Sequence, residues 1–176
     1  MNMDFFDAVK QRYSHKEGFL PDPVPLEHLD LIAGAGFSAP SGGNRQSVRL
    51  VILPDRAALQ PICDISPTVG LQTAPAAIAV FTDSSTQDGE FNFEKEDFSS
   101  AIEAMLLAAV ALGYASLWLD SPFYEKEKEK AVLDLLGAPG TFRLRAVLPV
   151  GMPDGPGTRR EKLPYNKRVF YRKYGA

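Results

Sequence analysis

The apolar residues of the chain fall into short runs that are separated by polar loops. Short continuous apolar runs are typical of buried strands. Such runs predict strands at residues 48–53, 76–81, 117–119 and 143–150. Apolar residues at helical spacing predict helices at residues 25–33, before Gly34 and Gly36, and at residues 125–136, the second with a charged solvent face. The mixture predicts an α+β fold with α/β-type layers, in which helices cover a sheet.

The most apolar helix is predicted at residues 101–112. Ser100 and Glu103 fit a capping box at its start, and Gly113 fits its end. Because this helix is apolar on nearly every face, it must be enclosed on all sides, which a second copy of a 176-residue chain achieves most easily. We therefore expect a homodimer. The polar residues 84–97 before it are predicted to form a surface loop or a mobile lid.

Two polar clusters are candidate binding segments. The loop Ala39-Pro-Ser-Gly-Gly-Asn-Arg-Gln46 joins tight-turn glycines to hydrogen-bonding side chains directly before a predicted strand, and a rigid strand can hold them toward a ligand. The cluster Arg12-Tyr-Ser-His-Lys16 follows a short helix that Asp4 opens, and His15 within it is expected to be an ordinary loop histidine. Taken singly, the loop also fits a polar turn, and each cation also fits a surface charge.

Composition narrows the class of protein. With 45% hydrophobic and 23% charged residues, the chain is expected to form one globular domain over residues 1–176. Its single cysteine, Cys63, excludes an internal disulfide and suits a reducing compartment. The longest apolar run is half the length of a membrane span, and the N-terminus does not read as a secretory signal. We therefore expect a cytoplasmic protein with no membrane partner.

Conventional catalytic motifs are missing from the sequence. The two histidines and one cysteine form no metal-ligand spacing, so no metal site is expected. The sequence also has no serine nucleophile elbow, P-loop or complete dinucleotide-binding glycine motif. Such a chain fits an enzyme whose cofactor carries out the electron chemistry while the protein binds and orients it.

Charge is unevenly distributed along the chain. Residues 154–176 carry seven Lys or Arg against two acidic residues, a charge of +5, whereas the remainder carries −8. Aromatic residues alternate with these cations, a pattern that nucleic-acid-binding segments also have. The acidic remainder would oppose a long polyanion, but two or three cations suffice for one phosphate group, so no nucleic acid is expected as a partner.

Four short motifs occur in order along nearly the whole chain. They are Arg12-Tyr-Ser-x-Lys16, Pro40-Ser-x-Gly-Asn44-x-Gln46, the helix-to-strand stretch 104–119 and Arg160-x-Lys162-Leu-Pro164. Together they resemble the nitroreductase family of FMN-dependent flavoproteins. The resemblance implies a nitroreductase-like FMN fold with a central mixed, mainly antiparallel sheet flanked by helices. It also implies a homodimer that exchanges C-terminal arms.

The resemblance further implies roles for individual residues in FMN binding. The groups that would hold the FMN phosphate are Arg12, Ser14, Arg160 and Lys162. Lys16 would lie by the pyrimidine edge and Tyr13 near the ribityl chain. The loop residues that would bind the ring edge and ribityl chain, from the partner subunit, are Pro40, Ser41, Gly42, Asn44 and Gln46. The flavin would also contact Trp118, Leu119 and Asp120, the last through its backbone N–H at flavin N5.

The function implied by the resemblance is that of an FMN-dependent NAD(P)H oxidoreductase. Hydride would pass from NAD(P)H through flavin N5 to a small acceptor such as a nitroaromatic or a quinone, with no catalytic side chain beyond the flavin. The alternative is an FMN-binding carrier or sensor without efficient turnover. The chain differs from many relatives at Ser47-Val48 and at Ala104, so the acceptor is left open.

Overall fold

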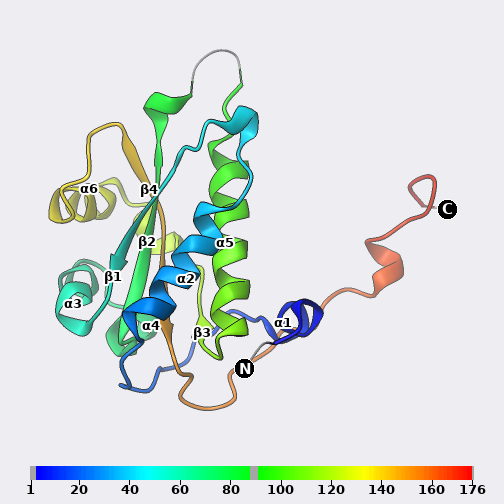
Figure 1. Ribbon diagram of the computed structural model, residues 1–176, viewed down its shortest axis with the longest axis horizontal. Helices are drawn as coiled ribbons and strands as arrows, with labels where there is room; N and C mark the ends of the chain where they lie inside the picture. The colour runs from blue at the N-terminus through cyan, green and yellow to red at the C-terminus, as the bar shows by residue number, and fades with distance from the viewer. Residues whose placement is uncertain (1–2, 88–90, 176) are drawn as a thin grey trace.

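The computed structural model describes residues 3–87 and 91–175 and has one four-stranded sheet at its centre (Figure 1). The strands are β1 (Val48–Leu53), β2 (Ala76–Asp83), β3 (Ala115–Ser116) and β4 (Phe142–Gly151). Their order is β1-β2-β4-β3, and all three neighbouring pairs are antiparallel. The two central strands, β2 and β4, are therefore the best protected, whereas β1 forms one edge of the sheet.

Helices cover both faces of this sheet. The helices are α1 (Phe5–Gln11), α2 (Leu26–Phe37), α3 (Arg56–Ile65), α4 (Val69–Thr73), α5 (Glu94–Ala111) and α6 (Lys126–Leu135). Short 3₁₀ helices are η1 (Gly42–Asn44), η2 (Ser84–Thr86), η3 (Ser121–Phe123) and η4 (Tyr165–Lys167). Helices α2 and α5 lie on one face of the sheet, and α3, α4 and α6 lie on the other (Figure 1).

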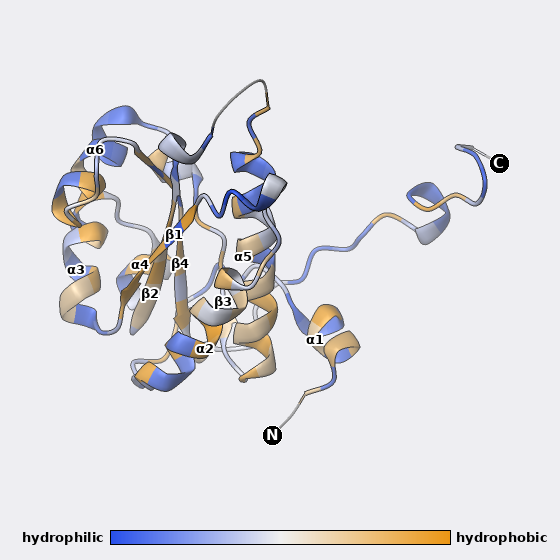
Figure 2. Ribbon diagram, turned by 45° about the horizontal axis from the view of Figure 1, so that its top comes forward, coloured by the Kyte–Doolittle hydropathy of each residue, from blue (hydrophilic) through white to orange (hydrophobic). Residues whose placement is uncertain are grey.

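Strand β2 explains why the chain folds around two separate layers of core. Side chains of successive strand residues point to opposite faces. Phe81 packs with α3 and α6 in one core cluster, whereas Ile78 and Val80 pack with α2 and α5 in the other. Both faces are buried, so residues 76–81 of β2 are apolar without alternation, and Figure 2 shows the central strands mainly in hydrophobic colours.

Several predicted elements are confirmed, and others need correction. The strands at 48–53, 76–81 and 143–150 and the helix at 125–136 match β1, β2, β4 and α6 to within two residues. Asp4 caps α1 through a hydrogen bond from the Phe6 N–H. The strand predicted at 117–119 is wrong, because β3 is residues 115–116 and Leu119 forms only an isolated bridge to Val147. Helices α3 and α4 were not predicted.

Helix α5 begins at Glu94, seven residues before the predicted start at 101, so the capping box at Ser100 is wrong. The predicted lid of residues 84–97 is therefore wrong over its last four residues, and residues 88–90 lie outside the described residues. Glu94, Glu96 and Asp97 occupy the first turn of α5, where negative charge stabilises the positive end of the helix dipole.

Helix α2 runs through both glycines to Phe37 instead of ending near Ala33. A Cβ atom on Gly36 would lie 2.8 Å from the Met105 Cγ on α5. Gly36 is therefore a point of close approach between two helices, a role that sequence alone does not separate from a helix stop.

The C-terminal segment leaves the body of the protein. Residues 158–169 and 171–175 are exposed, and the segment extends away from the sheet in both views (Figures 1 and 2). Several of its large side chains, including Tyr165, Tyr171 and Tyr174, are two-thirds exposed or more. Over residues 3–87 and 91–175, none of the helices is long and apolar enough to span a membrane.

Candidate functional site

The N-terminal cluster and the start of the C-terminal segment lie against each other. The Thr158 N–H donates to Glu17 Oε1 at 3.0 Å. Arg159 donates to the carbonyl oxygens of Lys10 at 2.8 Å and Gln11 at 2.7 Å, at the C-terminal end of α1. The segment that carries Arg160 and Lys162 therefore starts beside the segment that carries Arg12, Ser14 and Lys16, although nearly 150 residues separate them in sequence.

Tyr13 is the packing centre of this junction. The Arg159 guanidinium lies 4.9 Å from the centroid of its ring, and a Cβ atom on Gly157 would lie 2.4 Å from the ring. On the inner side, the Tyr13 hydroxyl lies 3.2 Å from Nδ1 of His15. Tyr13 thus contacts both segments of the junction, with the Arg159 cation held over its aromatic face.

His15 is fully buried and anchors the cluster. Its Nε2 lies 2.7 Å from the Gly18 carbonyl, which only accepts, so Nε2 donates, and in the neutral ring Nδ1 accepts from the Tyr13 hydroxyl. The ring also packs edge-on against Phe19. The sequence predicts His15 to be an ordinary loop residue, and its burial could not be anticipated because it depends on Phe19 and on the pairing of residues 14–15 with Ser116 of β3.

Residues 14–16 run beside strand β3. Ser14 forms a parallel bridge with Ser116, and the His15 N–H donates to the Ser116 carbonyl at 3.1 Å. The side chains of Ser14 and Lys16 are exposed on this surface. This pairing brings the N-terminal cluster to the strand that leads into Trp118, Leu119 and Asp120.

Trp118, Leu119 and Asp120 differ in how many of their polar groups are already hydrogen-bonded within the protein. Leu119 pairs with Val147 through both backbone groups. The Asp120 carboxylate accepts from the Tyr124 hydroxyl at 2.8 Å, and this hydrogen bond raises the pKa of Tyr124. Trp118 packs edge-on against Phe98, and its buried Nε1 has no hydrogen-bond partner in the described part of the chain. The Asp120 side chain is therefore engaged within the protein.

Arg12 points toward helix α5. Its Nε lies 3.3 Å from Glu103 Oε1, and the arginine side chain is 26% exposed. Nε itself is buried and makes no hydrogen bond to residues 3–87 or 91–175. The ion pair with Glu103 therefore holds the Arg12 side chain against α5.

The second predicted segment, residues 40–46, forms a tight turn before β1. Gly43, Asn44 and Gln46 have φ angles of 60°, 55° and 51°. The Asn44 N–H donates to the Ser41 carbonyl, and the Gln46 N–H donates to the Ser41 hydroxyl, both at 3.0 Å. The side chains of Asn44 and Gln46 are exposed. The Gly42 N–H donates to the Asp97 carboxylate, so this donor stabilises the turn and is not available to a ligand.

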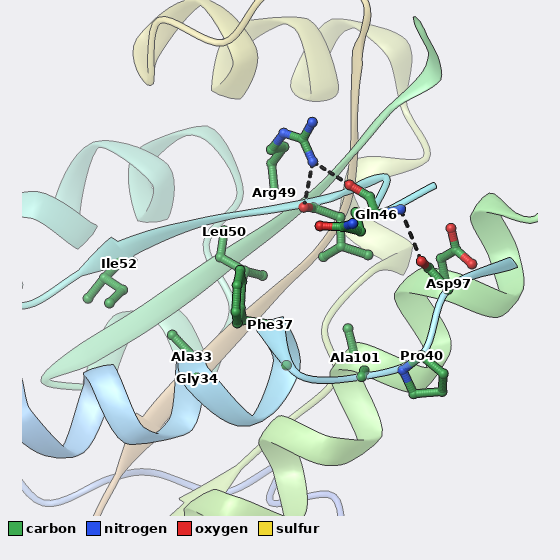
Figure 3. Close-up of a pocket in the computed structure, with 14 residues that line it drawn as sticks. Ala33, Gly34, Phe37, Pro40, Gln46, Arg49, Leu50, Ile52, Asp97 and Ala101 are labelled. Carbon is green, nitrogen blue, oxygen red and sulfur yellow. Dashed lines mark hydrogen bonds between the residues drawn. The ribbon is translucent and has the colours of Figure 1, made fainter. Parts of the chain in front are cut away.

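A cavity of about 420 Å³ adjoins this loop, between α2, β1 and the start of α5 (Figure 3). Its residues are Ala33, Gly34, Gly36, Phe37, Ala39, Pro40, Ser41, Gln46, Val48, Arg49, Leu50, Ile52, Asp97 and Ala101. Figure 3 shows Phe37 of α2 beside Leu50 of β1, with Pro40 and Asp97 on the other side. Most of the lining is apolar, and the predicted residues Pro40, Ser41 and Gln46 lie at its polar end.

The two predicted clusters do not form one pocket within a single chain. The loop is held at Asp97 of α5 and Arg12 at Glu103, six residues further on. Six residues of α-helix advance about 9 Å and turn about 240°, so the two contacts use different faces of α5. None of Arg12, Ser14, Lys16, Arg160 and Lys162 lines the cavity beside the loop.

Sequence reasoning missed Asp97 and Glu103. Asp97 was assigned to the predicted lid, and Glu103 to a helix cap. A signal for Asp97 exists in hindsight, because a cluster of acidic residues at 94–97 is typical of the first turn of a helix. Among residues 3–87 and 91–175, no group of three or more His, Cys, Asp or Glu residues is arranged to hold a metal ion.

Comparison with known proteins agrees with this architecture. The sequence profile of the nitroreductase family matches residues 9–69 and 66–152. Two archaeal proteins are each described as "Putative NADH dehydrogenase/NAD(P)H nitroreductase". The one from Archaeoglobus fulgidus is 34% identical over 72% of this chain and 73% of its own length. The one from Methanothermobacter thermautotrophicus is 30% identical over 89% and 82%.

Solved structures match over nearly the full length. A Bacteroides thetaiotaomicron protein with the same description superposes with a TM-score of 0.82 at 27% identity, over 99% of this chain and 100% of its own. A Desulfovibrio desulfuricans protein, described as a nitroreductase in complex with FMN, superposes with a TM-score of 0.81 at 25% identity, over 99% of each chain. The match of family profile, archaeal sequences and fold shows that this chain belongs to the nitroreductase family.

Proposed function

We propose that this protein is an FMN-dependent oxidoreductase that transfers hydride from NAD(P)H to a small acceptor such as a nitroaromatic or a quinone. The observation that carries the proposal is the junction of residues 10–17 with residues 157–159, which starts the segment of Arg160 and Lys162 beside the segment of Arg12 and Ser14. The family membership and the FMN complex of a relative support the same cofactor. When bound, FMN would supply the two-electron chemistry that the side chains lack.

The donor set at the junction fits a phosphate monoester. A dianion is held best by two or more cations with neutral donors beside them. Arg12, Arg160 and Lys162 supply the cations, and the exposed Ser14 supplies a hydroxyl. Glu103 offsets part of the Arg12 charge, which leaves Arg160 and Lys162 as the more electropositive pair.

The remaining predicted residues suit a polar ring edge and a ribityl chain. Lys16 is exposed beside β3, where its ammonium group would stabilise negative charge on the ring. The exposed side chains of Asn44 and Gln46 offer donors and acceptors for the ring edge. Because these loop residues lie on another face of α5 than Arg12, we assign them to the site of a second subunit.

The surface of α5 supports a homodimer. Ala104, Leu107, Ala108 and Ala111 recur at helical spacing and are only partly buried in one chain. Such an apolar stripe is stabilised by a second apolar surface, and a twofold axis lets the same stripe serve both subunits. Two copies of α5 packed together would bring the loop of one chain toward the Arg12 cluster of the other.

The exposed C-terminal segment is assigned to the same dimer. Its aromatic side chains leave the body of their own chain, and its charge of +5 complements the −8 of the remainder. The apolar cavity between α2 and edge strand β1 offers a surface for these side chains, and its polar end is the predicted flavin loop. We therefore assign this cavity to the C-terminal segment of the partner subunit.

Comparative titration of the apoprotein with FMN and riboflavin tests the cofactor assignment. A charge-assisted hydrogen bond contributes about 1.5–3 kcal/mol, so each phosphate contact corresponds to about tenfold or more in affinity. FMN should bind more tightly than riboflavin, and Arg160→Ala should reduce that preference by about tenfold. Equal affinity of the unmodified protein for FMN and riboflavin would exclude the assigned phosphate site.

A further inference from the structure

Asp97 is a buried carboxylate whose two oxygens both serve the predicted flavin loop. Its side chain is on the first turn of α5, and the residue is 1% exposed. Oδ1 accepts from the Gly42 N–H at 2.7 Å, and Oδ2 accepts from the Ser47 hydroxyl at 2.6 Å. The two donors flank the turn, one at each end, so a single carboxylate fixes the distance between them.

The loop needs such a restraint. Asn44 and Gln46 have φ angles of 55° and 51°, a region that residues other than glycine rarely adopt. Conformations of this kind persist only where the surrounding structure enforces them. The hydrogen bonds of Asn44 and Gln46 to Ser41 join residues of the same turn. The hydrogen bonds to Asp97 attach the turn to helix α5.

Neighbouring contacts make the attachment rigid on both sides. A Cβ atom on Gly42 would lie 2.2 Å from Cγ of Phe93, so the loop backbone rests directly on the residue before α5. At the other end, the Ser47 carbonyl accepts from the Asp83 N–H at 2.8 Å, which connects the loop to the end of β2. Asp97 therefore supplies the hydrogen bonds between this loop and α5, beside the packing on Phe93 and the backbone contact with β2.

A role in the helix dipole alone does not account for Asp97. Glu96, in the same turn, has an exposed side chain and supplies negative charge there without being buried. Burial of a carboxylate is costly unless hydrogen bonds compensate it, and both compensating bonds of Asp97 come from the loop. The burial is explained by the loop.

We propose that Asp97 is the positioning residue of the flavin site, which holds Asn44 and Gln46 in the backbone conformation that presents them to the cofactor. The inference rests on the proposed function. Asp97 acts through the loop and not on the phosphate, so its loss weakens ring recognition equally for ligands with and without a phosphate group. That equality separates it from the predicted phosphate-binding cations Arg12, Arg160 and Lys162.

The test compares Asp97→Ala, Asp97→Asn and Ser47→Ala with Glu96→Gln, an exposed acid in the same turn. Affinities for FMN and riboflavin are measured by fluorescence titration, and amide exchange at Gly42 is measured without flavin. Asp97→Ala should weaken both ligands by about the same factor, on the order of tenfold, and accelerate exchange at Gly42. Ser47→Ala should give a smaller loss, and Glu96→Gln should leave both readouts unchanged.

Asp97→Asn is the conservative variant that guards against a general folding defect. Its amide oxygen still accepts from Gly42 and its NH₂ group donates to Ser47, so affinity should be largely restored. If Asp97→Ala binds both ligands as tightly as the unmodified protein, or lowers only the affinity for FMN, the inference is wrong. If the unmodified protein binds neither ligand, the proposed function fails instead, and the exchange at Gly42 still reports whether Asp97 holds the loop.

Discussion

Arg159 lies over the ring of Tyr13, with its guanidinium 4.9 Å from the ring centroid, and also donates to the last carbonyl oxygens of helix α1. A cation at this end of a helix is favoured by the helix dipole, and an aromatic face adds to the attraction. The contact joins the two ends of the chain. Its consequence is that the segment with Arg160 and Lys162 begins beside the segment with Arg12 and Ser14.

Replacement of Arg159 should loosen that junction. Arg159→Ala removes a cation–π contact and two hydrogen bonds at a partly solvated site, so it should lower the free energy of unfolding by about 1 kcal/mol. FMN affinity should fall several-fold while riboflavin affinity changes little. Chemical denaturation and flavin titration measure both effects. Arg143→Ala, an exposed arginine at the start of β4, is the matched control and should change neither.

Lys16 should affect the midpoint potential of bound flavin more than it affects FMN affinity. A cation at the pyrimidine edge stabilises the negative charge of reduced flavin more than the neutral oxidised ring. Lys16→Met should therefore lower the midpoint potential of bound flavin, and should reduce FMN affinity less than Arg160→Ala does. Spectroelectrochemical titration of both variants measures this. An unchanged potential in Lys16→Met would place that lysine away from the ring.

Acid should weaken the hydrogen bonds of Thr158 to Glu17, while the contacts of Arg159 with α1 and Tyr13 remain. Hydrogen bonds from Thr158, above all from its side chain, hold the pKa of Glu17 below its ordinary value of 4.5. Because the folded pKa is depressed, the stabilising contribution is present above the unfolded pKa and is lost as pH falls through the folded one. The Thr158 amide signal in NMR spectra should shift with a midpoint below 4.5, and Glu17→Gln should abolish the shift. A midpoint above 4.5 would contradict the assigned hydrogen bond.

A mixed dimer tests whether two subunits share each site. One chain carries Arg160→Ala, and the other carries Asn44→Gly with Gln46→Gly, since glycine adopts positive φ without strain. If the loop of one subunit completes the cluster of the other, the mixed dimer has one intact site, although neither parent homodimer has any. Equilibrium titration of the purified mixed dimer counts tight FMN sites. No recovery of a tight site would place the loop and the cations in the same chain or in separate sites.

The sequence predicts the buried strands well because β2 is apolar from Ala76 to Phe81 and β4 from Ala146 to Val150, which needs no knowledge of their neighbours. It fails where tertiary packing decides the outcome. Gly36 indicates the end of a helix in the sequence, but in the structure it lies within α2 at the close approach to Met105 of α5. The start of α5 at Glu94 follows a polar stretch with isolated aromatic residues, and its sequence signal is the group of acidic residues at 94–97.

The same distinction applies to the candidate site. The cations and loop side chains can be proposed from the sequence because their residue types suit a phosphate group and a polar ring, and their roles stay predictions. The contacts of Asp97 and Glu103 could not be predicted, since these residues are distant in sequence from the groups they contact. His15 illustrates the point further, because its full burial follows from the pairing of residues 14–16 with β3.

Anaerobic reduction of the FMN-loaded protein tests the proposed activity most directly. NADH and NADPH are added in separate experiments, and the visible absorbance of oxidised flavin is followed by stopped flow, before a quinone or a nitroaromatic compound is introduced. An oxidoreductase predicts rapid bleaching by at least one nicotinamide and full recovery of the absorbance with an acceptor. Flavin that stays oxidised with both donors would contradict the account and identify the protein as an FMN carrier or sensor.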